Sequence, residues 1–213
     1  ITTSTYFKLN DPTGKYASAT KYSTDGDTIW NFEIPIPVSL GFVDPDVIEL
    51  NNGKYIFSYQ VIKGTQNVWL DYRYPPTFYF LNELGEIEND TFFVTKYKED
   101  FNSIVEGKGD YFFGLGSNEL YDEELQVFKY ASVLFKMSNE GQIIWKKEYT
   151  HKSYPSSPIK LMDLVEHDNG NITLLNNLYS LHDSKQLGWI LNIDENGCFD
   201  EIACDSTVIV TNI

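Results

Sequence analysis

One segment of the chain combines the residue types that recognise sugars. Trp69 stands close to Asp71, Tyr72, Arg73 and Tyr74, and Arg73 is the single arginine in the sequence. Aromatic faces stack on sugar rings, whereas carboxylate and guanidinium groups bind the hydroxyls. The segment therefore predicts a carbohydrate-binding loop. The alternative interpretation is that its aromatic side chains only pack the loop onto the fold.

A second group of candidate ligands is acidic. Residues 121–124 read Tyr121, Asp122, Glu123 and Glu124, and carboxylate oxygens are typical calcium ligands. A solvated acidic loop explains the same residues without an ion. No other cofactor is expected, because the histidines show no metal-ligand spacing; they are His151, His167 and His182.

The known catalytic motifs are absent from the sequence. It contains no nucleophile elbow, phosphate-binding loop or dinucleotide fingerprint. Paired carboxylates for glycoside hydrolysis stay open, because 31 acidic residues offer many pairs whose separation a sequence does not show. We therefore assign no catalytic residue and expect a protein that is not an enzyme.

Charge and hydropathy exclude two classes of partner. The 213 residues carry a formal charge of −15, which repels nucleic-acid phosphates and anionic membrane surfaces. No apolar run approaches the roughly 20 residues that span a bilayer. At 42% hydrophobic residues, the chain can nevertheless build a core.

The elements that must position these residues are short strands in a repeat. Aromatic and β-branched segments alternate with glycine turns, and one turn recurs at Gly26, Gly85, Gly141 and Gly197 with spacings of 59, 56 and 56 residues. A second turn recurs at Gly53, Gly109 and Gly170, with spacings of 56 and 61 residues. We expect two-residue hairpin turns, because glycine and asparagine accept the positive φ angles that such turns need.

The period predicts an all-β, propeller-like fold. Each unit of about 56–61 residues forms a four-stranded antiparallel blade, which gives about 3.5–4 blades at approximately 1–43, 44–100, 101–158 and 159–205. Residues 206–213 form a linker or a closing strand. The chain is expected to be part of a larger propeller, or a four-bladed ring in which residues 208–210 pair beside residues 6–8. A β-sandwich is the alternative, although it predicts no fixed period.

Antiparallel order places the tight turns at one face of the propeller and the long connections at the other. Binding residues are usually displayed on such long connections. The expected long segments are residues 31–44, 61–76, 94–100, 117–130, 146–158 and 178–186. Residues 118–129 are the best helix candidate, but they lack a clean apolar face and are interpreted as a loop with at most one helical turn.

The two cysteines, Cys198 and Cys204, lie close together near the end of the chain. A bridge between them would close a small loop and contribute about 2 kcal/mol in the chain-entropy model. We predict this disulfide, which implies an oxidising compartment.

Several motifs resemble those of known repeat proteins. Residues 23–30 and 138–145 resemble the Asp-box hairpin of sialidase-type propellers, and also the D-x-x-G-x-x-x-W repeat of quinoproteins with Ser23 and Ser138 replacing the aspartate. Residues 137–149 are similar to the propeller-like repeats of large secreted surface proteins from Bacteroidetes, which are cargo of type IX secretion. All of these motifs are structural. The last resemblance implies an extracellular or cell-surface location, with the sorting domain missing.

The same resemblance suggests O-glycosylation. Thr28 and Ser206 lie in sequences that resemble the Asp-Ser/Thr-apolar sequon of that phylum.

The sequence thus predicts an exported binding or adhesion module that presents long loops to a glycan or a protein. Further domains of the same polypeptide are possible partners. The alternatives are a fragment of a propeller enzyme, glycoside-acting or quinoprotein-like, and a structural spacer.

Overall fold

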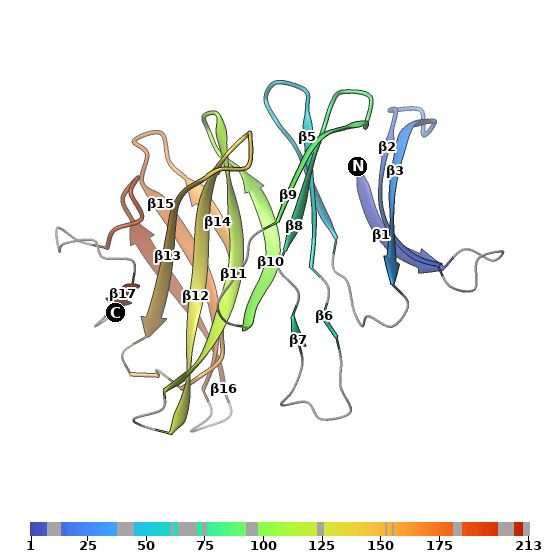
Figure 1. The fold of residues 1–213 in the computed structure, drawn as a ribbon. Coiled ribbons are helices and arrows are strands. Elements are labelled where there is room, and N and C mark those ends of the chain that lie inside the picture. Colours follow the sequence, from blue (N-terminus) through green and yellow to red (C-terminus); the bar gives the residue numbers. More distant parts are fainter. Residues whose placement is uncertain are drawn as a thin grey trace. The chain divides into compact units, whose positions relative to one another are not determined.

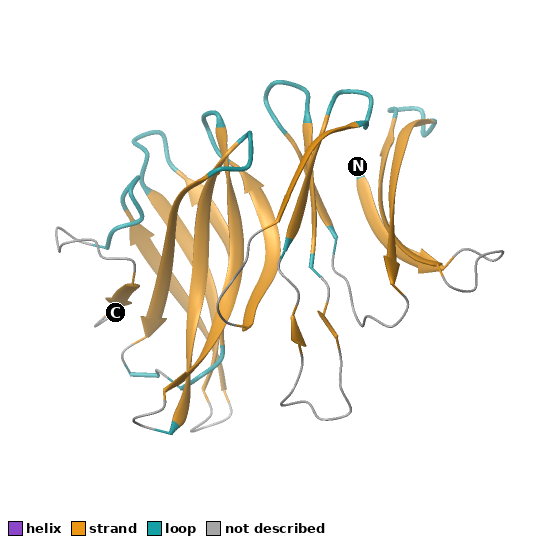
Figure 2. Cartoon of the chain, in the orientation of Figure 1, coloured by secondary structure: helices purple, strands orange, loops and turns teal. Residues whose placement is uncertain are grey.

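The computed structural model describes residues 1–7, 14–37, 45–60, 62–63, 72–73, 76–92, 98–122, 126–151, 153–154, 156–180, 185–199 and 207–210. All regular secondary structure in these residues is strand, and they contain no helix (Figure 2). The described sheets are open, since none closes on itself. The predicted all-β class with antiparallel sheets is confirmed. Within the described residues, no helix is long and apolar enough to cross a membrane.

The chain divides into two compact units, Ile1–Thr95 and Lys96–Ile213. The first unit contains two main sheets and a short ribbon (Figure 1). The first sheet has the order β1 (Thr2–Phe7), β2 (Gly14–Tyr22), β3 (Thr28–Pro37). The second has the order β4 (Asp46–Glu49), β5 (Tyr55–Tyr59), β8 (Thr77–Leu81), β9 (Ile87–Phe92). The ribbon pairs β6 (Ile62–Lys63) with β7 (Tyr72–Arg73).

The second unit contains the other two sheets. One has the order β10 (Lys98–Glu106), β11 (Tyr111–Asp122), β12 (Val127–Ser138), β13 (Ile143–His151), β17 (Thr207–Val210). The last sheet has the order β14 (Ile159–Glu166), β15 (Ile172–Ser180), β16 (Lys185–Ile193). β17 pairs in parallel with β13. The four-bladed ring predicted that residues 208–210 pair beside β1, and this pairing is not observed.

The recurring glycine turns are three-residue loops, not the two-residue turns expected from the sequence. At Gly26 the amide donates to the carbonyl of Ser23 at 3.1 Å, and the Ser23 amide donates to the carbonyl of Asp27 at 2.8 Å. Gly26 has a φ angle of +90°. This is a type I turn closed by a left-handed glycine, with a bulge in the strand register at Lys21 and Tyr22.

A side chain caps each turn of the first class. The residue three places before the glycine accepts hydrogen bonds from two backbone amides of the turn; these residues are Ser23, Asn82, Ser138 and Asp194. In the second class the residue directly before the glycine accepts one such bond at Gly53 and Gly170, through Asn52 and Asn169. The prediction is wrong for Gly109, which does not have positive φ and lies in the middle of the loop that the Gly107 amide closes on the Tyr111 carbonyl at 3.1 Å. The hydroxyls of Ser23 and Ser138 therefore accept the turn hydrogen bonds that the aspartate of the D-x-x-G-x-x-x-W motif would accept. This role is structural.

Several strands extend into segments that were expected to be long loops. Residues 118–122 continue β11 and pair with residues 127–131 of β12, so the expected loop with a helical turn is a strand hairpin. β3 likewise continues to Pro37 and β13 to His151. Paired strands satisfy the backbone hydrogen bonds of these segments, which outweighs the weak helical pattern.

Each unit packs the faces of its two sheets against one another. In the first unit the Phe32 ring of β3 meets the Phe57 ring of β5 edge-on, with centroids 5.2 Å apart. The buried core of the first unit contains Ala17, Ala19, Trp30, Phe32, Ile36, Tyr55, Phe57 and Leu81. The core of the second unit contains Phe113, Leu115, Leu134, Tyr149, Ile159, Leu161, Leu164, Ile172, Leu174, Leu178, Trp189, Leu191 and Ile193.

The same contact joins the two sheets in both units. The Trp30 indole of β3 lies against Gly85 in the turn of the next sheet, where a Cβ would meet Cδ2 of Trp30 at 2.7 Å. The Trp145 indole of β13 lies against Gly197, where a Cβ would meet it at 3.2 Å. The buried Tyr149 hydroxyl also donates to the Gly197 carbonyl at 3.0 Å. The spacing of glycine and tryptophan in the sequence therefore reflects contact between successive sheets.

Because of this contact, we expect Gly85→Ala to lower the free energy of unfolding more than Gly26→Ala does. Both glycines have positive φ, so each substitution loses about 1 kcal/mol from backbone strain. A Cβ on Gly26 meets nothing within 4 Å, whereas one on Gly85 clashes with Trp30 and adds about 1–3 kcal/mol. Urea unfolding of Gly85→Ala and Gly26→Ala measures the difference. Equal losses of stability would show that the indole contact contributes nothing.

Candidate functional site

The expected carbohydrate loop lies mostly outside the described residues. Tyr72 and Arg73 form the short strand β7, in which Arg73 pairs with Ile62. Trp69, Asp71 and Tyr74 are not among the residues that the structure describes. The backbone therefore shows a ribbon between β5 and β8, and the carbohydrate site there stays a prediction.

The other sequence-based candidates are also placed only in part. Asp122 ends β11, with Tyr121 beside it, but Glu123 and Glu124 lie outside the described residues. No group of three or more His, Cys, Asp or Glu residues in the described ranges could hold a metal ion. His182 also falls outside those ranges.

The candidate glycosylation sites and the predicted disulfide are also described only in part. Thr28 begins β3 and is exposed, directly after the Gly26 turn. Cys198 lies in the Gly197 turn, where its amide donates to Oδ1 of Asp194 at 2.7 Å. Cys204 and Ser206 lie outside the described residues, so the bridge and the second glycosylation site stay predictions.

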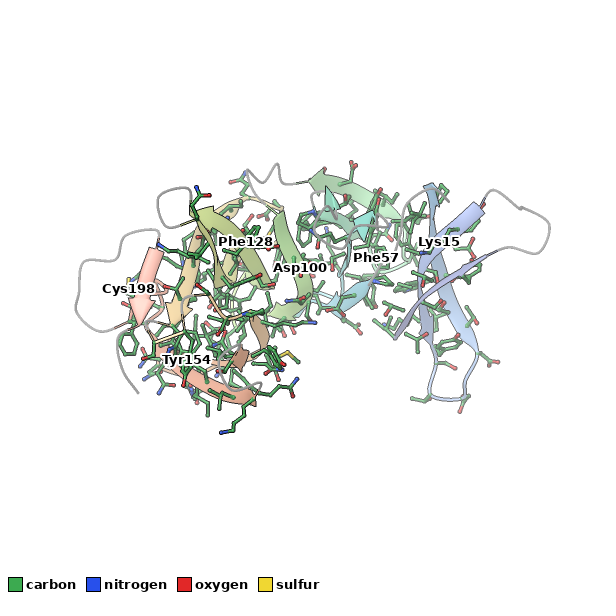
Figure 3. The ribbon with its side chains drawn as sticks, turned by 90° about the horizontal axis from the view of Figure 1, so that it is seen from below. Lys15, Phe57, Asp100, Phe128, Tyr154 and Cys198 are labelled. Atoms are coloured by element: carbon green, nitrogen blue, oxygen red, sulfur yellow. The ribbon has the colours of Figure 1, made fainter. Side chains whose placement is uncertain are left out.

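A pocket of about 530 Å³ in the second unit is the strongest candidate site that the structure describes. This volume falls within the range of small-molecule sites. The residues that line it are His151, Ser153, Tyr154, Leu178, Leu187, Gly188, Trp189 and Ile190. Most are apolar or aromatic, and Tyr154 is labelled in Figure 3.

The pocket lies where the long connections leave the sheets. His151 is the last residue of β13, Leu178 is close to the end of β15, and Leu187 is close to the start of β16. All three positions are at the ends of the strands opposite the glycine turns. Two of the expected loop segments, residues 146–158 and 178–186, therefore contribute to one site.

Two consecutive turns hold the first wall of the pocket in place. The Tyr154 amide donates to the His151 carbonyl at 3.0 Å, and the Ser157 amide donates to the Tyr154 carbonyl at 3.1 Å. The Tyr179 amide then donates to the carbonyl of Pro158 at 2.9 Å, which fixes this segment to β15. These bonds bring His151 and Tyr154 to the same side of the pocket.

Aromatic rings form the floor of the pocket. The His151 ring lies 5.1 Å from the Tyr154 ring and 5.3 Å from the Trp189 ring, centroid to centroid. The second contact is edge-on, with an interplanar angle of 80°. Trp189 is only 5% exposed. This floor suits an apolar group or the face of a ring.

Several buried polar atoms of His151, Trp189 and Asn176 have no hydrogen-bond partner in the described part of the chain, and the first two residues line the pocket. They include Nδ1 of His151, Nε1 of Trp189 and both amide atoms of Asn176. Asn176 is 1% exposed and stands directly opposite Trp189 on the neighbouring strand. Buried polar groups without partners are rare in folded proteins, and they commonly meet water or a ligand.

Burial lowers the pKa of His151 below its ordinary value of 6.5. The imidazole is therefore neutral at pH 7 and can both donate and accept a hydrogen bond. Its Nδ1 is buried and has no hydrogen-bond partner in the described part of the chain. The site thus offers an uncharged polar group beside the Tyr154 and Trp189 rings.

Sequence reasoning missed these residues because it judged histidines by metal-ligand spacing alone. One signal was present. The inward-facing positions of β15 carry Ile172, Leu174 and Leu178, with Asn176 among them. An amide at a core position of an alternating strand marks a place where the core is not purely apolar.

The lowered pKa of His151 makes the stability of the second unit depend on pH. The unfolded chain binds a proton near pH 6.5 and the folded chain resists it, so stability falls as the pH drops below about 6.5 toward the folded pKa. The His151→Leu variant should lose this part of the dependence. Urea unfolding at pH 7.5 and 5.5 tests it, and an unchanged pH dependence in the variant would contradict the assignment.

No family model matches the chain, and no curated protein matches it. Several solved structures are similar to it, and the following two illustrate the likeness. A protein of unknown function from Bacteroides caccae is 14% identical, over 92% of this chain and 79% of that one, with a TM-score of 0.35. A hypothetical protein from Leishmania major is 16% identical, over 96% of this chain and 67% of that one, with a TM-score of 0.47.

Proposed function

We propose that the protein is a non-catalytic binding module that holds its partner at the long-connection ends of its sheets. The observation that carries this proposal is the pocket of His151, Tyr154 and Trp189. It combines an aromatic floor, a neutral imidazole and buried polar atoms without partners. A rigid sheet scaffold positions all of them, as in other proteins that bind through their loops.

The chemistry of the pocket supports binding rather than reaction. Its described lining contains no Asp, Glu, Lys or Cys. Ser153 stands two residues from His151, but no hydrogen bond joins the two side chains within the described ranges. A serine nucleophile needs such a bond to a base, although this bond is often loose before substrate binds.

We also propose that the sheets are successive blades of a propeller-like array. The indole-on-glycine contact supports this arrangement, because it recurs between the sheets of each unit. The outer face of the last sheet carries exposed apolar side chains that a further sheet would cover; they are Met162, Val165, Leu175, Tyr179 and Ile190. Covering such a face is favourable in water.

The outer face of the first sheet is different in character. Its side chains hydrogen-bond to one another, for example Thr20 to Asn31 at 2.8 Å and Asn31 to Glu33 at 2.9 Å. A four-bladed ring would bury this polar face against the apolar one, which is unfavourable. The faces therefore favour a longer array, whose polar end resembles the caps of repeat proteins.

An extracellular or cell-surface location completes the proposal. The predicted bridge between Cys198 and Cys204 and the resemblance to secreted repeat proteins support it. An adhesion role on such a surface requires only that the pocket holds a glycan or a protein segment. Mass spectrometry of the native protein, with and without reductant, tests for the bridge.

Binding assays with pocket variants test the proposed function. A glycan array and a peptide array are probed with the wild type, with His151→Ala and with Tyr154→Ala. We expect each variant to weaken binding about tenfold, because each removes a polar contact or an aromatic wall worth about 1–2 kcal/mol. His167→Ala is the matched control, since His167 is exposed in the turn at the other end of the strands.

The Trp69→Ala and Arg73→Ala variants test whether the ligand binds in the pocket or at the loop of residues 69–74 that the sequence suggested. Loss of binding in these two variants alone would move the site to the loop. A wild-type protein that retains no ligand from either array would contradict the binding proposal and leave a structural spacer.

A further inference from the structure

The outer face of the first sheet carries polar and tyrosine side chains. The core of the first unit takes odd-numbered residues of β2 and even-numbered residues of β3, among them Ala19 and Phe32. Because side chains alternate along a strand, the even positions of β2 and the odd positions of β3 point away from this core, together with their partners on β1. We call this surface the polar face. Its side chains include Tyr6, Tyr16, Ser18, Thr20, Asn31 and Glu33.

Two tyrosines form an aromatic platform on the polar face. Tyr6 of β1 stands opposite Tyr16 of β2, but its hydroxyl donates to Oε1 of Glu33 on β3. The Tyr6 and Glu33 side chains therefore meet above β2, which lies between their strands, and Ser18 on that strand is only 4% exposed. The Tyr6 and Tyr16 rings are nearly parallel, with an interplanar angle of 23° and centroids 5.8 Å apart. This arrangement suits the face of a second ring.

A row of hydrogen bonds continues from the platform. Nδ2 of Asn31 donates to Oε1 of Glu33 at 2.9 Å, and the Thr20 hydroxyl donates to Oδ1 of Asn31 at 2.8 Å. The Ser4 and Ser18 hydroxyls are joined at 2.9 Å. These bonds order the side chains before a ligand arrives, which lowers the entropy cost of binding. Asn31 is exposed and has a second N–H to donate, and the Thr20 oxygen has lone pairs to accept, so the row can bond to hydroxyls in both senses.

The charge of the polar face selects against acidic ligands. Among its described side chains only Glu33 is charged, and the lysines of β2, Lys15 and Lys21, occupy odd positions on the other side of the sheet. Phosphate and acidic sugars are therefore repelled. A protein partner is also disfavoured, because the centre of a protein interface is apolar, whereas here it holds hydroxyls and a carboxylate. A neutral sugar fits both parts of the face, since its ring stacks on tyrosine and its hydroxyls donate and accept hydrogen bonds.

The polar face is longer than one sugar ring. Tyr22 lies six residues along β2 from Tyr16, on the same side of the strand, and is 45% exposed. At the rise of an extended strand, the two tyrosines are about 20 Å apart. A second aromatic contact at this distance suits an extended sugar chain rather than a monosaccharide.

We propose that the polar face is a second binding site, which takes a neutral polysaccharide chain. One sugar ring stacks on the platform of Tyr6 and Tyr16, and the chain runs along β2 to Tyr22. Its hydroxyls donate to Thr20 and accept from Asn31. This inference goes beyond the proposed function, because the site lies on a different sheet from the His151 pocket and does not depend on it.

Affinity electrophoresis of the full chain tests the site. The gels contain hydroxyethylcellulose, arabinoxylan or galactomannan, which are neutral, or polygalacturonate, which is acidic. At least one neutral polysaccharide should retard the protein, and polygalacturonate should not. Tyr22→Ala and Asn31→Ala should each weaken the binding about fivefold to tenfold, because each removes an exposed contact and leaves the core intact. Tyr179→Ala is the matched control, since Tyr179 is 40% exposed on the last sheet.

Further variants separate the platform from the pocket. Tyr6→Phe keeps the ring and should retain more binding than Tyr6→Ala, whereas Tyr154→Ala should leave polysaccharide binding unchanged. Retardation by no neutral polysaccharide, or an equal loss in Tyr22→Ala and Tyr179→Ala, would overturn the inference and leave the proposed function to its own arrays. A loss in Tyr154→Ala without one in Tyr22→Ala would also overturn it, because the polysaccharide would then lie in the pocket, as the proposed function allows.

Discussion

An indole ring lying on a glycine turn is the constraint on which the rest of this structure depends. Trp30 covers Gly85 and Trp145 covers Gly197, once in each compact unit. The glycines need positive φ to close their turns, and they also need to lack a Cβ so that the ring can approach. One residue type therefore satisfies a local and a non-local requirement. This explains why glycine recurs in all four turns of the first class, and why tryptophan follows the turn in the first sheet of each unit.

The constraint acts at one end of the sheets and leaves the other end free to differ. At the turn end, capped loops and the Tyr149 hydroxyl join successive sheets. At the opposite end the connections range from a short ribbon to a long hairpin, as β6–β7 and β11–β12 show. A site can form there without weakening the contacts between sheets. The His151 pocket lies at this end.

Local patterns were sufficient to predict the class of fold and its turns. The glycines at 26, 85, 141 and 197 marked hairpins, because their neighbours alternate and their φ angles are rare for other residues. Non-local facts could not be predicted in the same way. The partner of β17 depends on residues about 60 positions away, and the hairpin of residues 118–131 depends on a pairing that the sequence pattern does not encode.

The candidate site was accessible from the sequence only as a region. Long-connection segments were expected to carry it, and residues 146–158 and 178–186 do contribute. His151 and Trp189 meet through tertiary packing between strands 38 residues apart, which neither spacing nor composition reports. The sequence shows Asn176 as a polar residue among apolar ones, but not that it pairs with Trp189 on the neighbouring strand.

The most direct test of the pocket uses the four tryptophans as reporters. Their indole N–H signals are resolved in a nitrogen–proton correlation spectrum, and a Trp189→Phe variant assigns the signal of Trp189. Addition of the ligand selected on the arrays should shift that signal and leave those of Trp30 and Trp145, which are held between sheets, unchanged. A shift confined to Trp69, or no shift at all, would contradict the claim that the His151 pocket is the binding site.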